Sequence, residues 1–338
     1  MLDLVVYLVS WFVVPPWSLV GWASLGALVW GINRFRYPWW RSPQSMDGKT
    51  VVITGANKGI GLETARDLVG RGATVILACR STTRAHAARD DIMSGGWRGK
   101  VEVAQLDVSS MASVRQFAKN LHGRKVDVLI NNAAVADLPQ QLTSDGHELT
   151  IATNHLGHFL LTHLLMQNLK EAGGRVVTVT SIGHIWVKDV KGLDLDGDLK
   201  FQLDRPLGTL EIYGASKAMN ILFTKELDRK LSGTAGVTAN CLHPGVVNTD
   251  IFKVFTSRVW YGLFVKLFVR TYAKSSTEGA QTSIMLAASD ELKNVSGQYF
   301  QDCKIAECSS LVKDEGVAKK LWEISERLVQ LQPHERTL

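Results

Sequence analysis

Short apolar runs alternate with amphipathic segments along most of the chain. The runs predicted as strands are Thr50–Thr54, Thr74–Ala78, Val101–Leu106, Val126–Ile130, Arg175–Thr180, Val237–Leu242 and one near Gly297–Phe300. The segments between them with apolar residues at three- and four-residue spacing, predicted as helices, are Gly61–Arg71, Thr83–Met93, Met111–His122, Glu148–Lys170, Ile212–Leu231 and Ser275–Ala288. This alternation predicts one α/β domain with a doubly wound, parallel, seven-stranded sheet that binds ligands beyond the carboxyl ends of its strands.

The N-terminal segment has a different pattern. No charged residue occurs from Leu4 to Ile32, whereas about 20 apolar residues are enough to cross a bilayer. We therefore predict a membrane anchor over residues 1–33 and a basic, aromatic linker over 34–48. Pro15-Pro16 interrupts the run, so that either one kinked helix spans the membrane or a shorter helix from about Trp17 does so after an interfacial segment.

The charges around this segment predict its orientation. Asp3 precedes the apolar run, and three basic residues follow it: Arg34, Arg36 and Arg41. A cleaved signal would begin with basic residues, so we expect an uncleaved, single-pass anchor with the rest of the chain in the cytosol, at the endoplasmic reticulum membrane. Trp39 and Trp40 are typical of the membrane interface. A buried core helix of a soluble domain is the alternative reading.

Composition and charge narrow the function classes. The chain has 338 residues, 46% of them hydrophobic and 21% charged, which is typical of a folded domain rather than a multi-span transporter. The net charge of +6 comes from scattered residues, which argues against a nucleic-acid partner. The four cysteines show no CxxC pair, so we predict neither a disulfide framework nor a metal site.

The turn after the first predicted strand suits a dinucleotide. Thr54–Gly61 reads TGANKGIG and opens a helix, with glycines where the chain must turn tightly and approach a ligand. A pyrophosphate suits such a helix N-terminus. Arg80 ends the second strand, where an acidic residue would bind a ribose, and its guanidinium favours the 2′-phosphate of NADP instead. Lys58 is a second candidate cation for that phosphate.

A second cluster of residues suits proton transfer. Tyr213 and Lys217 are four residues apart and therefore share one face of a helix. A neighbouring ammonium favours the ionised form of a phenol, which would make the tyrosine a proton donor or acceptor near neutral pH. Ser181 closes the fifth strand, where its hydroxyl can hydrogen-bond a substrate oxygen. Asn154 lies on the preceding long helix.

Together these motifs resemble the short-chain dehydrogenase/reductase superfamily and its Rossmann-type fold. The resemblance covers about residues 48–331 and also rests on Asn131–Ala134 and Pro244-Gly245. It implies that Tyr213 is the acid/base, that Lys217 lowers its pKa and holds the nicotinamide ribose, that Ser181 positions the carbonyl and that Asn154 supports a proton relay. The cofactor-binding residues that we expect are Gly55, Asn57, Lys58, Gly59, Ile60, Gly61, Arg80, Asp107, Val108, Asn131, Ala133, Tyr213, Lys217, Pro244, Gly245, Val247 and Thr249. Ala134 departs from the glycine that many members have.

Longer stretches resemble the membrane-anchored retinol dehydrogenase/retinal reductase group. They are Ala78–Arg80, Asn154–Thr162, His243–Gly245, Gly279–Ser283 and Ser296–Cys303, and the spacing of about 32 residues between Ser181 and Tyr213 is also similar. The resemblance implies an NADP(H)-dependent oxidoreductase of retinal and retinol or similar apolar aldehydes and alcohols, acting as a reductase, and leaves a homodimer open. A steroid, prenyl or other lipid carbonyl is the alternative substrate. A non-catalytic, membrane-tethered NADP-binding protein is the alternative class.

One apolar segment lies where a substrate lid is expected. Val254–Arg270 is rich in aromatic and aliphatic residues and has only three charges. We therefore predict an NADP-binding domain over 49–332, a lid over about 246–274 that contacts substrate or membrane, and a tail over 333–338. A helix packed on the domain, or a dimer contact, is the alternative for the lid.

Overall fold

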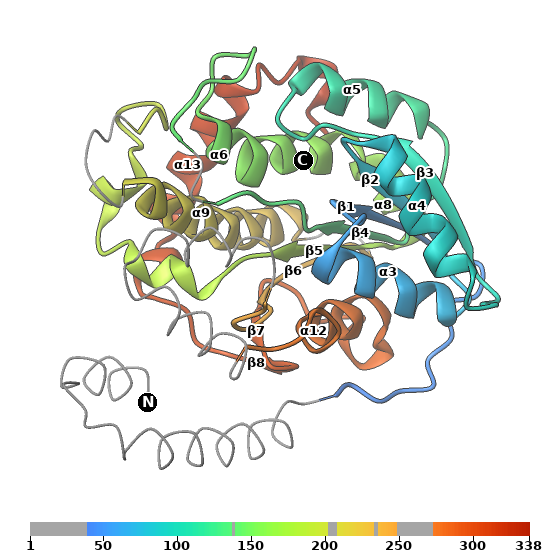
Figure 1. Cartoon of the computed structure of the whole chain (residues 1–338). Coiled ribbons are helices and arrows are strands. Elements are labelled where there is room, and N and C mark those ends of the chain that lie inside the picture. The colour runs from blue at the N-terminus through green and yellow to red at the C-terminus, as the bar shows by residue number, and fades with distance from the viewer. Residues whose placement is uncertain (1–38, 137–138, 202–207, 233–235, 249–272) are drawn as a thin grey trace, which may run out of the picture.

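The computed structural model describes residues 39–136, 139–201, 208–232, 236–248 and 273–338. One sheet crosses this part of the chain in the order β3-β2-β1-β4-β5-β6-β7-β8 (Figure 1). Its strands are β1 (Thr50–Thr54), β2 (Thr74–Cys79), β3 (Lys100–Gln105), β4 (Val128–Asn131), β5 (Arg175–Val179), β6 (Thr238–His243), β7 (Tyr299–Gln301) and β8 (Lys304–Ile305). The seven predicted strands are confirmed, and they run parallel.

The eighth strand corrects the prediction of a purely parallel, seven-stranded sheet. β8 pairs antiparallel with β7 after a tight turn. Asp302 and Cys303 form this turn, with φ angles of 52° and 58° in the left-handed region. A strand of two residues is too short to show an alternation of apolar and polar positions, which is why the pattern did not reveal it.

Helices cover both faces of the sheet (Figure 1). They are α3 (Gly59–Gly70), α4 (Thr82–Met93), α5 (Met111–Asn120), α6 (Leu149–Ile151), α7 (Gly157–Leu164), α8 (Met166–Ala172), α9 (Gly208–Leu231), α12 (Ser276–Ala288) and α13 (Glu315–Leu328). Val51 and Ile53 face the core under α3, α4 and α12, whereas Val52 faces the core under α5, α7, α9 and α13. Because β1 is buried on both faces, its sequence is a continuous apolar run.

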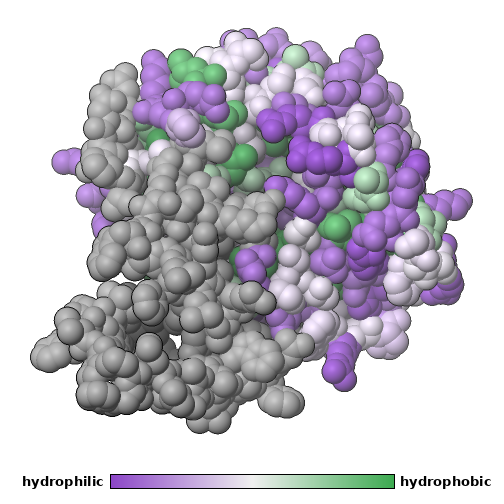
Figure 2. Space-filling view, viewed as in Figure 1, coloured by the Kyte–Doolittle hydropathy of each residue, from purple (hydrophilic) through white to green (hydrophobic). Residues whose placement is uncertain are grey.

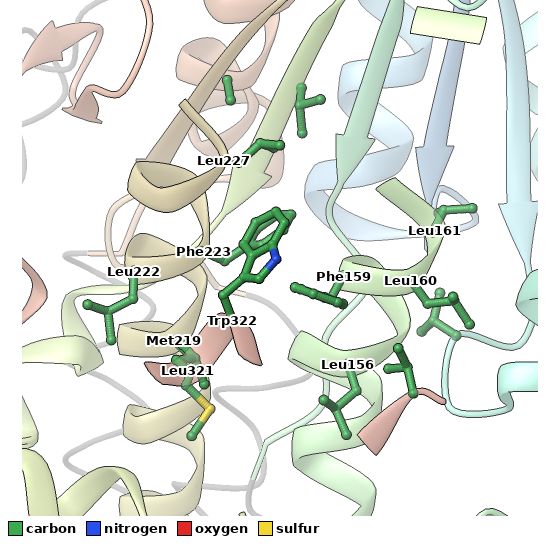
Figure 3. Close-up of a cluster of buried hydrophobic side chains, with 14 of the residues drawn as sticks. Leu156, Phe159, Leu160, Leu161, Met219, Leu222, Phe223, Leu227, Leu321 and Trp322 are labelled. Atoms are coloured by element: carbon green, nitrogen blue, oxygen red, sulfur yellow. The ribbon is translucent and has the colours of Figure 1, made fainter. Parts of the chain in front are cut away.

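Helix α13 was not predicted from the sequence. Its N-cap, Asp314, accepts a hydrogen bond from the Val317 amide at 3.0 Å. The Trp322 ring stacks on Phe223 of α9, with the ring centres 5.8 Å apart, and meets Phe159 of α7 edge-on at 4.9 Å. Figure 3 shows this junction, where the indole closes the gap between the two helices. The C-terminal helix therefore completes the core on this face.

The predicted long helix Glu148–Lys170 is interrupted. After α6 the backbone makes a π-helical turn over Ala152–Leu156 before α7 begins, and α8 continues to Ala172. A π-helical turn inserts one extra residue in the helix and is frequent at functional sites. Asn154 lies in this turn.

Two predicted segments lie mostly outside the described residues. The anchor at 1–33 precedes them, and the lid segment Val254–Arg270 falls in the gap between 248 and 273. Within the described ranges, no helix has the length and apolar character needed to cross a bilayer. The described surface in the view of Figure 2 is largely hydrophilic, with small, separate hydrophobic areas, as expected for a domain that buries its apolar residues.

Several buried histidines are neutral in the folded domain. Burial lowers the pKa of His155 and His163 to about 4, and that of His158 and His243 to about 3. His155 hydrogen-bonds the Ser325 hydroxyl at 2.9 Å, and His158 hydrogen-bonds Thr54 at 2.9 Å. His155 and His158 therefore serve packing and hydrogen bonding in the core.

This burial predicts loss of stability in mild acid. The unfolded chain takes up protons at these histidines below their ordinary pKa of 6.5, whereas the folded chain does not until pH approaches 3–4. Stability is thus fully present above pH 6.5 and falls as pH is lowered, by about 1.4 kcal/mol for each such histidine at pH 5.5. Urea unfolding in detergent, followed against pH, measures this. His155→Gln should reduce the proton uptake on unfolding by about one. A free energy of unfolding that depends on pH equally in this variant and in the unchanged protein would contradict the account.

Candidate active site

The predicted catalytic residues meet at the carboxyl ends of β4, β5 and β6. Ser181 lies two residues beyond β5, and Tyr213 lies on α9, which packs beside this edge. The Ser181 hydroxyl is near enough to Tyr213 to oppose the rise in the pKa of the phenol. The Ser181 Oγ also accepts the Gly183 amide at 3.1 Å, which fixes its direction. A substrate oxygen at this edge could therefore contact a phenol and a hydroxyl together.

Lys217 lies one helical turn beyond Tyr213 and is buried. Its Nζ donates a hydrogen bond to the Val179 carbonyl at 3.1 Å and lies 5.7 Å from the centre of the Tyr213 ring. Burial lowers the pKa of Lys217 to about 7. Water hydrates a buried ammonium poorly. The Lys217 ammonium is therefore stabilised by hydrogen bonds to any further acceptor that reaches the same edge of the sheet.

The pKa of Tyr213 differs from the sequence expectation. Burial raises it, and the hydrogen bond with Ser181 opposes that rise. A nearby ammonium by itself would lower the pKa of the phenol, but the low-polarity surroundings penalise the phenolate more strongly. In the protein alone, Tyr213 is therefore a protonated donor near neutral pH.

Asn154 connects the π-helical turn to the site. Its side-chain carbonyl accepts the Val135 amide at 2.9 Å, and its amide group donates to the Val135 carbonyl at 2.9 Å and to Ser216 Oγ at 3.0 Å. Ser216 is the residue before Lys217 in α9. Asn154 thus joins the loop after β4 to the helix that holds the tyrosine and the lysine.

The turn between β1 and α3 has the predicted shape of a phosphate site. Gly55 and Gly59 have φ angles of 66° and 59°, which favour glycine. A Cβ on Gly61 would lie 2.6 Å from the Asn132 side chain, so only glycine fits where the turn meets the loop after β4. Lys58, at the N-cap of α3, makes no side-chain capping bond, and the first turn has no acidic residue. The amide groups of this helix end are suited to an anion.

The other predicted cofactor residues border this turn. Arg80 follows β2 and is exposed, and backbone groups of Ala56 and Asn57 hydrogen-bond the Cys79 thiol beside it. Asp107 accepts the Ser109 amide and hydroxyl, at 3.0 and 2.6 Å. The residues that the structure places at the carboxyl edge as expected are Gly55, Asn57, Lys58, Gly59, Ile60, Gly61, Arg80, Asp107, Val108, Asn131, Ala133, Pro244, Gly245 and Val247. Thr249 lies outside the described residues.

Thr54 is a site residue that the sequence reasoning missed. Its buried Oγ1 accepts the amides of Asn132 and Ala133, both at 2.9 Å, and so ties the loop after β4 to the end of β1. Next to it, Asn131 donates to Thr162 at 3.1 Å, and its Oδ1 has no partner among the described residues. The sequence feature that could have indicated this role is the position of the threonine directly before the glycine turn.

Two histidines hold the turn that carries Ser181. His184 Nδ1 hydrogen-bonds the Ser181 carbonyl at 2.8 Å, and His243 Nδ1 accepts the Ile182 amide at 3.1 Å. Neither histidine is among the predicted site residues, and His243 appears only at the start of the motif His243–Gly245. Their roles depend on the meeting of β5 and β6, which no local sequence pattern shows.

Comparison with known proteins places this geometry in a family. The sequence model described as "short chain dehydrogenase" matches residues 49–185. Mouse retinol dehydrogenase 12 is 42% identical over 289 residues, which cover 84% of this chain and 87% of that protein. Human retinol dehydrogenase 13 is 41% identical, covering 86% and 87% respectively. The chain belongs to the short-chain dehydrogenase family.

A solved structure supports the same assignment. An uncharacterised protein of Mycobacterium paratuberculosis is 34% identical and superposes with a TM-score of 0.69, covering 87% of this chain and 98% of its own. The chain is accordingly an oxidoreductase that acts on CH–OH or C=O groups with a nicotinamide cofactor.

The Thr54 contacts predict a selective loss of stability. Thr54→Val leaves the half-buried amides of Asn132 and Ala133 without an acceptor and removes the hydrogen bond to the buried His158, so it should lower the free energy of unfolding by about 2 kcal/mol. Thr178→Val is the matched control, because the buried Thr178 hydroxyl has no partner among the described residues. That change should be neutral or stabilising. Urea unfolding of both variants measures the free energy of unfolding. An equal decrease in the two variants would contradict this role of Thr54.

Proposed function

We propose that this protein is a membrane-anchored, NADPH-dependent reductase of retinal or a similar apolar aldehyde. The observation that carries the proposal is the buried Tyr213 beside Ser181 at the carboxyl edge of the sheet, with Lys217 one turn away. Asn154, Ser181, Tyr213 and Lys217 are the proposed catalytic residues. Their arrangement suits proton donation to a carbonyl oxygen.

The chain's own residues divide the work of the reaction. When bound, NADPH supplies the hydride for the carbonyl carbon. Ser181 orients the carbonyl oxygen by a hydrogen bond, and Tyr213 donates its phenolic proton to that oxygen as negative charge develops. The Lys217 ammonium, already directed to this edge by Val179, stabilises the phenolate that remains. Asn154 keeps α9 and the loop after β4 in register through Ser216 and Val135.

The cofactor preference rests on the turn and on Arg80. The uncapped start of α3 suits the pyrophosphate, and the exposed guanidinium after β2 suits the adenosine 2′-phosphate. No acidic residue stands at position 80 to accept hydrogen bonds from a free ribose. Because most of the NADP(H) in the cytosol is in the reduced form, NADPH, an enzyme with this preference works as a reductase.

The substrate class rests on similarity and on the lid sequence. The relatives named above are retinol dehydrogenases, at about 40% identity over most of their length. The aromatic and aliphatic stretch Val254–Arg270 and the uncharged run Leu4–Ile32 both favour a substrate that dissolves in lipid. We therefore propose single-pass anchoring with the enzyme domain in the cytosol.

Substrate turnover tests the mechanism. NADPH consumption by the detergent-solubilised protein is measured with retinal, a prenyl aldehyde, a medium-chain aldehyde and a ketosteroid. Retinal should be turned over fastest, and Tyr213→Phe should lower kcat about 100-fold or more with cofactor binding retained. Faster turnover of another substrate would refute the retinoid assignment, and unchanged activity of the phenylalanine variant would refute the mechanism.

A second variant tests the cofactor preference. Arg80→Asp replaces attraction of the 2′-phosphate by repulsion and should weaken NADPH binding roughly 100-fold relative to NADH. Arg89→Asp on α4, a charge change away from the turn, is the control and should leave the ratio unchanged. Dissociation constants from cofactor fluorescence give the answer; an equal loss of both cofactors in Arg80→Asp would show that Arg80 does not bind the phosphate.

A further inference from the structure

The described part of the linker is docked on the domain. The Trp40 amide donates to the Gln281 side chain of α12 at 3.2 Å, and the Arg71 guanidinium lies 4.7 Å from the centre of the Trp40 ring. Arg71 also donates to the carbonyls of Ser42 at 2.7 Å and Gln44 at 3.2 Å. One arginine at the end of α3 thus binds the linker by its backbone and by an aromatic ring.

Further contacts fix the other end of the linker. The Met46 amide donates to the Arg71 carbonyl at 2.9 Å, and the Met46 side chain is buried. The Gln44 side chain hydrogen-bonds Asp290, just beyond α12. Residues 39–46 are therefore held along α3 and α12; Figure 1 shows the blue linker passing along the outer side of α12.

The direction of the linker follows from α12. This helix starts just after Lys274, which pairs with Val247 beyond the carboxyl end of β6, and it runs back toward the opposite edge of the sheet. Gln44 contacts Asp290, two residues after the end of α12, whereas Trp40 contacts the second turn of this helix. Followed from Met46 to Trp40, the linker approaches the edge that holds Ser181 and Tyr213. The uncharged run Leu4–Ile32 joins the domain at that end.

Two exposed indoles lie on the same face. The side chains of Trp39 and Trp97 are 48% and 43% exposed. Both line one cavity of about 450 Å³ between the linker, α3 and α12. The arginines of this face have acidic partners, since Arg66 binds Asp91 at 2.6 Å and Arg71 binds Asp67 at 2.5 Å. The unexplained feature is thus the pair of tryptophans, a residue type enriched at membrane interfaces.

We propose that the docked linker is a strap that holds this face against the lipid surface. Trp39 and Trp97 lie at the interface. Because Trp97 precedes β3 at the amino edge of the sheet, it is the α3–α12 face that rests on the membrane, and the carboxyl edge with Tyr213 lies beside the bilayer from which an apolar substrate arrives. The inference rests on the anchoring proposed above. The occupant is a bilayer, because the apolar segment of the same chain joins the domain at this face.

A fluorescence experiment on the full chain tests the orientation without turnover. Arg98→Cys places a bimane label beside Trp97, and Glu323→Cys on α13, on the opposite face of the sheet, is the matched control; Cys303 and Cys308 are replaced by serine in both. The proteins are reconstituted in phosphatidylcholine vesicles containing a lipid with a nitroxide headgroup. The fraction of fluorescence that the nitroxide lipid quenches should be at least about twice as large for the label at 98 as for the label at 323. If both proteins float with the vesicles but the two labels are quenched equally, the strap is refuted and the anchor is retained. If the proteins do not float with the vesicles, both the anchor and the strap are refuted.

Releasing the strap gives the second readout. Arg71→Ala with Gln281→Ala should abolish the excess quenching at 98. The KM for a vesicle-dissolved aldehyde should rise at least threefold, with kcat and the KM for a water-soluble aldehyde unchanged. Gln281→Ala alone, which removes the hydrogen bond to the Trp40 amide and one within α12, should act in the same direction if the double variant unfolds. A release that changes neither quenching nor KM would contradict the strap.

Discussion

The packing of α9 against the carboxyl ends of β5 and β6 is the constraint on which the site depends. Tyr213 and Lys217 both lie on the side of this helix that faces the sheet, and the Lys217 ammonium reaches the Val179 carbonyl across it. Trp322 of α13 fills the space between α9 and α7 further along. A shift of α9 would open this core, so the spacing of the reacting side chains is set by apolar packing.

The same burial sets the chemistry of the site. Low polarity raises the pKa of the Tyr213 phenol and lowers that of the Lys217 ammonium to about 7, so the charged form of each group costs more than it would in water. Removing water also strengthens every interaction with a developing charge. A phenol that holds its proton until a carbonyl oxygen becomes basic is suited to the reduction of an aldehyde.

Much of the architecture could be predicted because its signals are local. The strands lie within about two residues of their predicted bounds, since each is a short apolar run between polar turns. The eighth strand and the π-helical turn at Asn154 could not be predicted, because a strand of two residues and one inserted residue produce no periodic pattern in the sequence. Helix α13 does have buried apolar residues at helical spacing, at Val317, Leu321 and Trp322, so its pattern is sufficient to predict a helix.

The site shows the same division. Tyr213, Lys217 and the glycine turn are motifs within a few residues of sequence, and the structure brings them to one edge. Thr54 and His243 act through amides that are distant in sequence, so their roles appear only when β1 meets β4 and β5 meets β6. Neighbouring charge alone also gave the wrong direction for the pKa of Tyr213, because burial is not visible in a sequence.

Isotope transfer tests the central claim most directly. NADPH that carries deuterium at both hydrogen positions of nicotinamide C4 is incubated with retinal and the full-length enzyme, and the alcohol is examined by mass spectrometry. The account predicts retinol with one deuterium per molecule, formed at a rate that depends on Tyr213. Retinol without the label, or labelled retinol formed equally fast by Tyr213→Phe, would contradict it.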